Sequence, residues 1–211
     1  MRLFLIILLL TFGIQSWTKA NDVSEFEIEG MSIGSSLLDH FNKSEILTLI
    51  KSNNSFFYKG NAYVSITTHA NYDKYQNLIK NEPLLNIKDK YDYLGVIIKP
   101  DDNNFIIFEI SAYINFPDDI DSCIKKKNEI VNDISLTFDG IKSDNETGPH
   151  SYDKSGKSIA HNSWFNLDIG TLSVHCEDWS KEFEDIGWSD KLKVRLMSNT
   201  IMDFLRNVQY K

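Results

Sequence analysis

The chain has 211 residues, of which 42% are hydrophobic and 25% are charged, and its formal net charge is −8. This composition excludes an intrinsically disordered chain, and the length suffices for one domain with a hydrophobic core. Because an acidic surface repels phosphate backbones, nucleic-acid binding is not expected.

Residues 1–20 have the layout of a secretory signal peptide. Arg2 supplies a positive start, an apolar run from Leu3 to Ile14 follows, and Thr18 and Ala20 are small residues at the −3 and −1 positions of a cleavage site. The apolar run is shorter than the roughly 20 residues that a membrane span needs. We therefore expect removal of the leader after Ala20, no stable membrane span afterwards, and a periplasmic or secreted protein.

Short strands and helices alternate in the first half of the mature chain. Apolar residues at helical spacing predict helices within 35–50 and 72–80. Two β-rich arms around a glycine turn predict a hairpin over 56–67, and two more around a polar loop predict a second hairpin over 93–114. The arm 105–110 starts apolar on both faces, which predicts a central position in the sheet.

The segment 118–138 is the clearest predicted helix. Pro117 and the acids that follow it suit a first helical turn, because proline needs no partner there and carboxylates complement the helix dipole. The next segment, 139–157, is polar, contains several glycines and lacks periodicity, so we expect an exposed loop. The apolar face of the helix consists of Ile120, Cys123, Ile124, Val131, Ile134 and Phe138.

A third hairpin over 158–177, a last strand over 191–197 and an amphipathic helix over 200–209 close the chain. Taken together, the elements predict one α+β domain over 21–211. We expect a mainly antiparallel sheet of about six to eight strands, with the helices packed on it.

Cys123 and Cys176 are the only two cysteines. An even pair in an exported chain indicates a disulfide, and two buried free thiols are the alternative. Both residues fall on the apolar faces of their predicted elements, as a helix-to-sheet bridge requires. In the chain-entropy model a loop of this length stabilises the fold by about 4 kcal/mol.

Four residues of the third hairpin form a candidate acid–base site. His161 and His175 lie on facing arms, with Asp168 and Glu177 nearby, so correct pairing could bring them together. The same residues could form a weak surface metal site, and solvated histidines are the simpler alternative. No serine of this hairpin lies in a Gly-x-Ser-x-Gly turn, and no histidine or cysteine cluster has metal-site spacing, so no metal or other cofactor is expected.

Three tryptophans in the last third are candidates for ligand binding. Trp164, Trp179 and Trp188 would suit a sugar or peptide face if exposed, and would belong to the core if buried. The run Gly156-Lys157-Ser158 resembles the end of a phosphate-binding loop. That motif is rejected because Ser151 stands where it needs a glycine.

The segment from Phe26 to Asp39, FEIEGMSIGSSLLD, resembles the mature start of a group of small exported proteins from AT-rich marine bacteria. The run CIKKKNEI from Cys123, with its end near Phe138, is also similar to them. The resemblance implies a bacterial protein outside the cytoplasm. It implies no particular activity and provides no site residues.

These features favour a non-catalytic binding protein of the bacterial envelope, with an envelope protein or a carbohydrate or peptide ligand as its partner. A secreted hydrolase that uses the four hairpin residues is one alternative, and it requires their side chains to converge in a concave pocket. A structural subunit of a surface assembly is another, and it requires an open strand edge or a large apolar patch.

Overall fold

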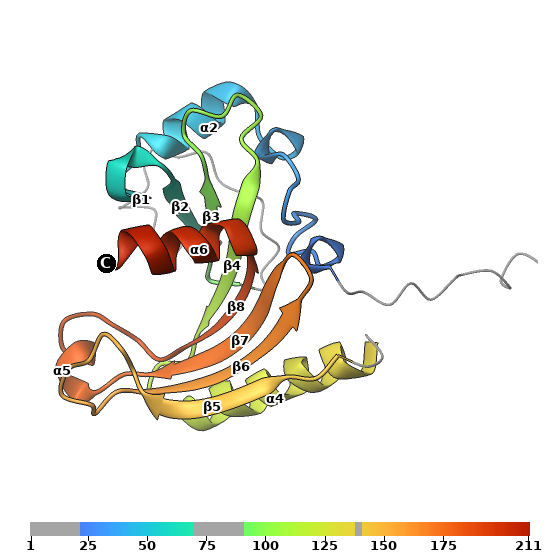
Figure 1. The fold of residues 1–211 in the computed structure, drawn as a ribbon. Coiled ribbons are helices and arrows are strands. Elements are labelled where there is room, and N and C mark those ends of the chain that lie inside the picture. The colour runs from blue at the N-terminus through green and yellow to red at the C-terminus, as the bar shows by residue number, and fades with distance from the viewer. Residues whose placement is uncertain (1–21, 70–90, 138–140) are drawn as a thin grey trace, which may run out of the picture.

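The computed structural model describes residues 22–69, 91–137 and 141–211, and one antiparallel sheet organises them (Figure 1). The strand order is β1-β2-β3-β4-β8-β7-β6-β5, so two four-stranded meanders meet where β4 pairs with β8. The strands are β1 (Ser55–Phe57), β2 (Val64–His69), β3 (Tyr93–Ile98), β4 (Ile107–Asn115), β5 (Asp144–Pro149), β6 (Ile159–Leu167), β7 (Gly170–Asp178) and β8 (Lys191–Ser198).

Side-chain caps fix where several helices begin. Asn42 and Glu45 form a capping box at the start of α2, and Ser198 accepts a hydrogen bond from the backbone of Ile201 in α6. The described α-helices are α2 (Lys43–Ile50), α4 (Ile120–Thr137), α5 (Lys181–Glu184) and α6 (Asn199–Phe204), with shorter helical segments η1 (Val23–Glu25), η2 (Leu37–Asp39), η3 (Lys59–Asn61) and η4 (Leu205–Gln209).

One face of the sheet forms the main core. Strand residues alternate between faces, and on β7 the buried side chains of Leu172, Val174 and Cys176 all point to this side. The N-terminal segment, α2 and α4 cover it, and their buried residues belong to one hydrophobic cluster with those of the strands. Each fully buried aliphatic side chain there contributes about 1.5–3 kcal/mol of transfer free energy.

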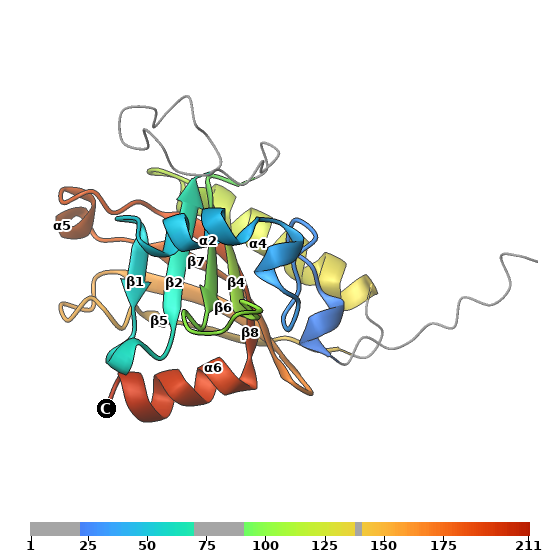
Figure 2. The same ribbon diagram turned by 90° about the horizontal axis from the view of Figure 1, so that it is seen from above.

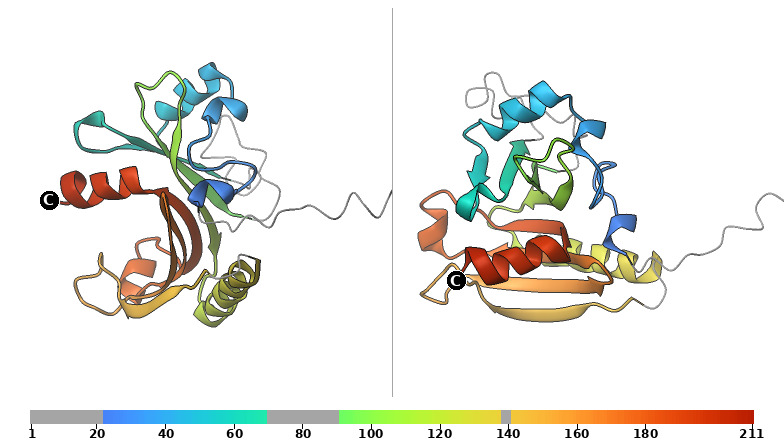
Figure 3. Two further views of the ribbon diagram at one scale, coloured as in Figure 1. Left: turned by 45° about the vertical axis from the view of Figure 1, so that its right-hand side comes forward. Right: turned by 45° about the horizontal axis from the view of Figure 1, so that its top comes forward.

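The opposite face is concave and only partly covered. Figure 2 shows α6 and α4 on different sides of the strands, and Figure 3 shows the sheet curving with α4 outside the curve. Ile201 and Leu205 pack against Tyr63 and Ile97 at one end of the concave face. The polar remainder of that face lines a cavity.

The disulfide expected between Cys123 and Cys176 is confirmed. Their Sγ atoms lie 2.04 Å apart and their Cα atoms 6.0 Å apart, which joins α4 to β7 across the main core. Both side chains are fully buried. The bond therefore attaches the long helix to the centre of the second meander.

The α+β class and the antiparallel sheet are confirmed, and two local features differ from expectation. Part of the expected loop 139–157 forms the edge strand β5, which escaped notice because its side chains are mostly exposed and show no alternation of apolar and polar residues. The expected helix 35–50 is divided into η2 and α2, because Asn42 adopts an extended conformation and starts a new helix.

The expected leader 1–20 and the expected helix 72–80 lie outside the described residues. Within the three described stretches, no helix is long and apolar enough to cross a bilayer.

Candidate functional site

A polar cavity of about 570 Å³ lies on the concave face of the sheet. Side chains from β2, β3, β4, β6, β7 and β8 form its floor, and the loop after β5 together with Tyr58 and Tyr210 forms its rim. This volume is within the range of small-molecule sites, about 300–1,000 Å³.

Strand register brings the floor residues together. Directly paired residues of antiparallel strands point to the same face, so Tyr113, Lys193, His175 and Asn162 form one row across β4, β8, β7 and β6. Along β8, Lys191, Lys193 and Arg195 alternate with core residues. Three cations of one strand therefore point to the concave side.

A buried ion pair lies at one end of the floor. Arg195 Nη2 donates a hydrogen bond of 2.5 Å to Glu109 Oε2, and Ser111 Oγ donates one of 2.8 Å to Glu109 Oε1. Burial alone would raise the pKa of Glu109, which is 4% exposed, but the Arg195 charge outweighs burial and the pKa is lowered. Glu109 is therefore ionised and fully engaged at neutral pH.

A second ion pair lies at the other end. Lys191 Nζ is 3.2 Å from Glu177 Oε2, and His150 Nε2 is 3.9 Å from Glu177 Oε1. Burial would raise the pKa of Glu177, but His150 and Lys191 lower it to about 2. The Lys191 ammonium also lies over the rings of Trp179 and Trp188, at 5.8 and 5.5 Å.

Lys193 lies between these two pairs without a carboxylate of its own. Its Nζ lies 5.0 Å from the centre of the Tyr113 ring, and no described carboxylate is within ion-pair distance of it. Its neighbour His175 is neutral at physiological pH, because burial and the Lys193 charge lower its pKa to about 3. The ammonium of Lys193 is therefore the charge at the centre of the floor that has no ion pair of its own with a described residue.

The rim is polar and aromatic. Tyr152 and Tyr210 are 63% and 67% exposed and lie at the mouth of the cavity, together with His150. Tyr58 is more buried, and burial together with the nearby Glu109 charge raises the pKa of its phenol. The tyrosines among these groups offer hydroxyl and ring contacts to an occupant of the cavity.

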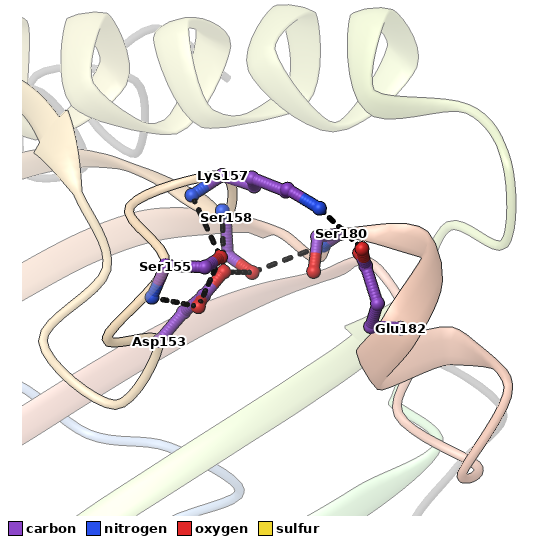
Figure 4. A network of polar contacts seen from close by, with 6 residues as sticks. All are labelled: Asp153, Ser155, Lys157, Ser158, Ser180 and Glu182. Atoms are coloured by element: carbon purple, nitrogen blue, oxygen red, sulfur yellow. Dashed lines mark hydrogen bonds and ion pairs between the residues drawn. The ribbon is translucent and has the colours of Figure 1, made fainter.

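A hydrogen-bond network fixes the rim loop, residues 150–158 (Figure 4). Asp153 accepts bonds from the backbone and hydroxyl groups of Ser155 and Ser158 at 2.6–2.8 Å, which hold the pKa of its carboxyl below the ordinary range. Ser158 Oγ in turn accepts a bond of 3.0 Å from the Ser180 backbone. Lys157 also pairs with Glu182, so the loop is attached both to α5 and to Ser180, which precedes α5.

The structure brings together two of the four hairpin residues proposed for acid–base chemistry. His175 and Glu177 both line the cavity. His161 pairs directly with Cys176, which points into the core. Paired residues share a face, so His161 lies on the core face of the sheet and not on the face of the cavity. Asp168 is exposed in the turn between β6 and β7.

The three candidate tryptophans lie in different surroundings. Trp179 is buried and packs against Phe183 and Trp188, with ring centres 5.2 and 4.4 Å away. Trp188 is 39% exposed, and it lines a second, open groove beside Lys191. Trp164 is half-buried on the concave face of the sheet, opposite Ser173.

The charged residues of the floor, other than Glu177, were not predicted as site residues. The alternation KLKVRL in β8 was a usable signal, because it places three cations on one face of a strand. Glu109 inside the apolar arm of β4 was a second signal, since a carboxylate in a central strand needs a partner. The pairing of β4 with β8, which brings these residues together, had no local signature.

Among the residues that the structure describes, no group of three or more histidine, cysteine, aspartate or glutamate side chains could hold a metal ion. Comparison of the chain with protein-family models, curated proteins and solved structures found no match.

Proposed function

We propose that the protein is a non-catalytic binding protein that works outside the cytoplasm and takes a small polar ligand into the concave cavity. The observation that supports this function best is the floor itself. It is concave, two ion pairs fix Glu109, Arg195 and Glu177, and its volume suits a small molecule. Such groups are already oriented before a ligand arrives, which lowers the entropy cost of binding.

Export is supported by two independent features. The leader-like segment 1–20 has the layout of a signal peptide. The bond between Cys123 and Cys176 is of the kind that persists in oxidising compartments. The periplasm and the external medium both meet these requirements.

The acid–base chemistry of a hydrolase is less well supported by the cavity. His175 has a pKa of about 3, which makes it a weak base at neutral pH. The Ser111 hydroxyl, which would be a candidate nucleophile, donates to Glu109 rather than to a histidine. The floor therefore favours binding over catalysis.

A surface assembly would use an open strand edge, and the two edges of the sheet are β1 and β5. Strand β1 has only three residues, and β5 contains Asp144, Glu146 and Pro149, which discourage pairing with another strand. Neither strand offers the long apolar edge that such an assembly favours.

Blocking the cavity tests the proposed function. We would screen polar small molecules (sugars, amino acids and organic acids) for an increase in thermal stability, because a ligand that binds only the folded state raises the unfolding midpoint. Asn162→Trp places a large side chain on the cavity floor. Asn166→Trp makes the same change on the same strand and face, outside the cavity lining.

We expect at least one compound to stabilise both the unmodified protein and Asn166→Trp, and to lose its effect on Asn162→Trp. An equal effect on the two variants would contradict the proposal, and so would a screen in which no compound stabilises the protein.

A further inference from the structure

Among the described residues, two of the three cations of β8 form ion pairs, and the third, Lys193, does not. Lys191 is paired with Glu177 and Arg195 with Glu109, which engages both acids of the floor. Lys193, between them, lies over the Tyr113 ring and beside neutral His175. It is near enough to Glu109 and Glu177 to lower their pKa values but within ion-pair distance of no described carboxylate. Lys193 is therefore the cation of the described cavity floor without an ion pair of its own, in a chain whose net charge is −8.

Arg195 adds further unused donors. Glu109 Oε2 is the only described acceptor of its guanidinium, and the buried Nε has no acceptor at all. A guanidinium has five N–H groups, and buried donors without partners are unfavourable. The side chain is 22% exposed and lines the cavity, so part of it is within reach of an incoming oxygen atom.

We propose that the cavity binds a small molecule through an oxyanion group, a carboxylate or a phosphate, that lies between Lys193 and Arg195. This inference rests on the proposed binding function and specifies the chemical class of its ligand. Lysine and arginine are the residues that most often bind such groups, lysine as a point charge and arginine as a planar donor.

The other charges near the cavity do not cancel this preference. Glu146 on β5 is the remaining acid of the lining, and it is exposed at the edge of the sheet, where solvent and salt screen it. His175 is neutral and can donate or accept a hydrogen bond according to its tautomer. The tyrosine hydroxyls of Tyr58, Tyr152 and Tyr210 line the cavity on the side of the uncharged part of the ligand, and those of Tyr152 and Tyr210 are hydrogen-bonded to each other.

Calorimetric titration of the disulfide-bonded protein tests the inference with two pairs of probes. Malonate is compared with malonamide, and glucose 6-phosphate with glucose, so that each pair differs mainly in charge. We expect at least one charged probe to bind about tenfold or more tightly than its uncharged counterpart, with an affinity that falls as salt is added. The probe that binds better distinguishes a carboxylate ligand from a phosphate ligand.

Two matched variants locate the binding. Lys193→Gln removes the unmatched charge without breaking an ion pair, so the fold should be retained, and we expect about a tenfold loss of affinity for the charged probe. Lys125→Gln makes the same change of charge on an exposed position of α4, outside the curve of the sheet, and should leave the affinity unchanged. Thermal melts of both variants establish that they are folded.

The outcomes separate this inference from the proposed function. If an uncharged probe binds as tightly as its charged counterpart and Asn162→Trp abolishes its binding, the cavity is a ligand site and the oxyanion inference is overturned. Equal affinity of Lys193→Gln and Lys125→Gln for a charged probe would also overturn it. Failure of all four probes at millimolar concentrations would overturn it as well, while the wider screen still tests the proposed function.

Discussion

Glu109 and Arg195 show how a buried charge can be retained in this sheet. The carboxylate of Glu109 is almost completely removed from water, and it is compensated by the guanidinium of Arg195 and the hydroxyl of Ser111. Such a pair contributes little net stability compared with apolar residues of the same size. Removal of one partner alone strongly destabilises the protein, because the other charge then stays buried without a partner.

Glu109→Gln should therefore destabilise the protein strongly. We expect the free energy of unfolding to fall by about 3–5 kcal/mol, measured by urea denaturation at neutral pH. Glu182→Gln removes an acid from an exposed pair with Lys157 and should leave the free energy almost unchanged. Similar values for the two variants would show that the Glu109 pair is not buried as described.

His175 should make the protein sensitive to mild acid. Its pKa falls from 6.5 to about 3 on folding, so between these values the unfolded chain binds a proton that the folded chain does not. The contribution of His175 to the free energy of unfolding should therefore be complete above pH 6.5. Below pH 6.5 the free energy of unfolding should decrease by up to about 1.4 kcal/mol per pH unit because of this residue. Glu177, whose pKa is lowered from 4.5 to about 2, causes a further decrease in the free energy of unfolding below pH 4.5.

Denaturation at a series of pH values checks this behaviour. In His175→Gln, the free energy of unfolding should depend clearly less on pH between 6.5 and 4.5 than in the unmodified protein. An unchanged slope would mean that His175 protonates as readily in the folded as in the unfolded state.

At the scale of elements, α4 depends on its covalent bond to β7. Of its side chains, only Cys123 and Lys127 are buried, and its apolar residues Ile124 and Ile130 are half-buried against the core. The helix therefore buries less apolar surface than a core helix would. The bond closes a loop with a sequence separation of 53 residues, which corresponds to about 4 kcal/mol in the chain-entropy model.

Reduction of the bond should lower the free energy of unfolding by about that amount, about 4 kcal/mol. Hydrogen exchange should increase first in α4, since the helix then relies on its half-buried apolar face. The double variant Cys123→Ser/Cys176→Ser should match the reduced protein and show no response to reductant. Two freely alkylatable thiols in the purified protein would contradict the bond itself.

The elements that were predicted correctly are those with local signals. The three hairpins and the helix 118–138 have alternation, turns or first-turn residues that do not depend on distant partners. Strand β5 has none of these, and it is defined only by its pairing with β6. The separation of His161 from His175 depends on register, because a shift of one residue moves every side chain to the other face.

For the whole molecule, the cavity is a consequence of how the two meanders join. Arg195 of β8 meets Glu109 of β4 from the first meander, and Lys191 of β8 meets Glu177 of β7 from the second. Curvature of the sheet and the position of α6 at one end leave the polar centre open (Figure 3). The proposed ligand explains why Lys193, a cation without an ion pair of its own, lies in this cavity of an acidic protein.

Mapping the bound probe onto the backbone by nuclear magnetic resonance tests this account most directly. On titration with the tighter of malonate and glucose 6-phosphate, we expect saturable shifts of the amides of Ser111, His175, Lys193 and Arg195, and none on α4. Shifts confined to α4 or spread over the surface, or no saturable shift on the cavity floor, would contradict it.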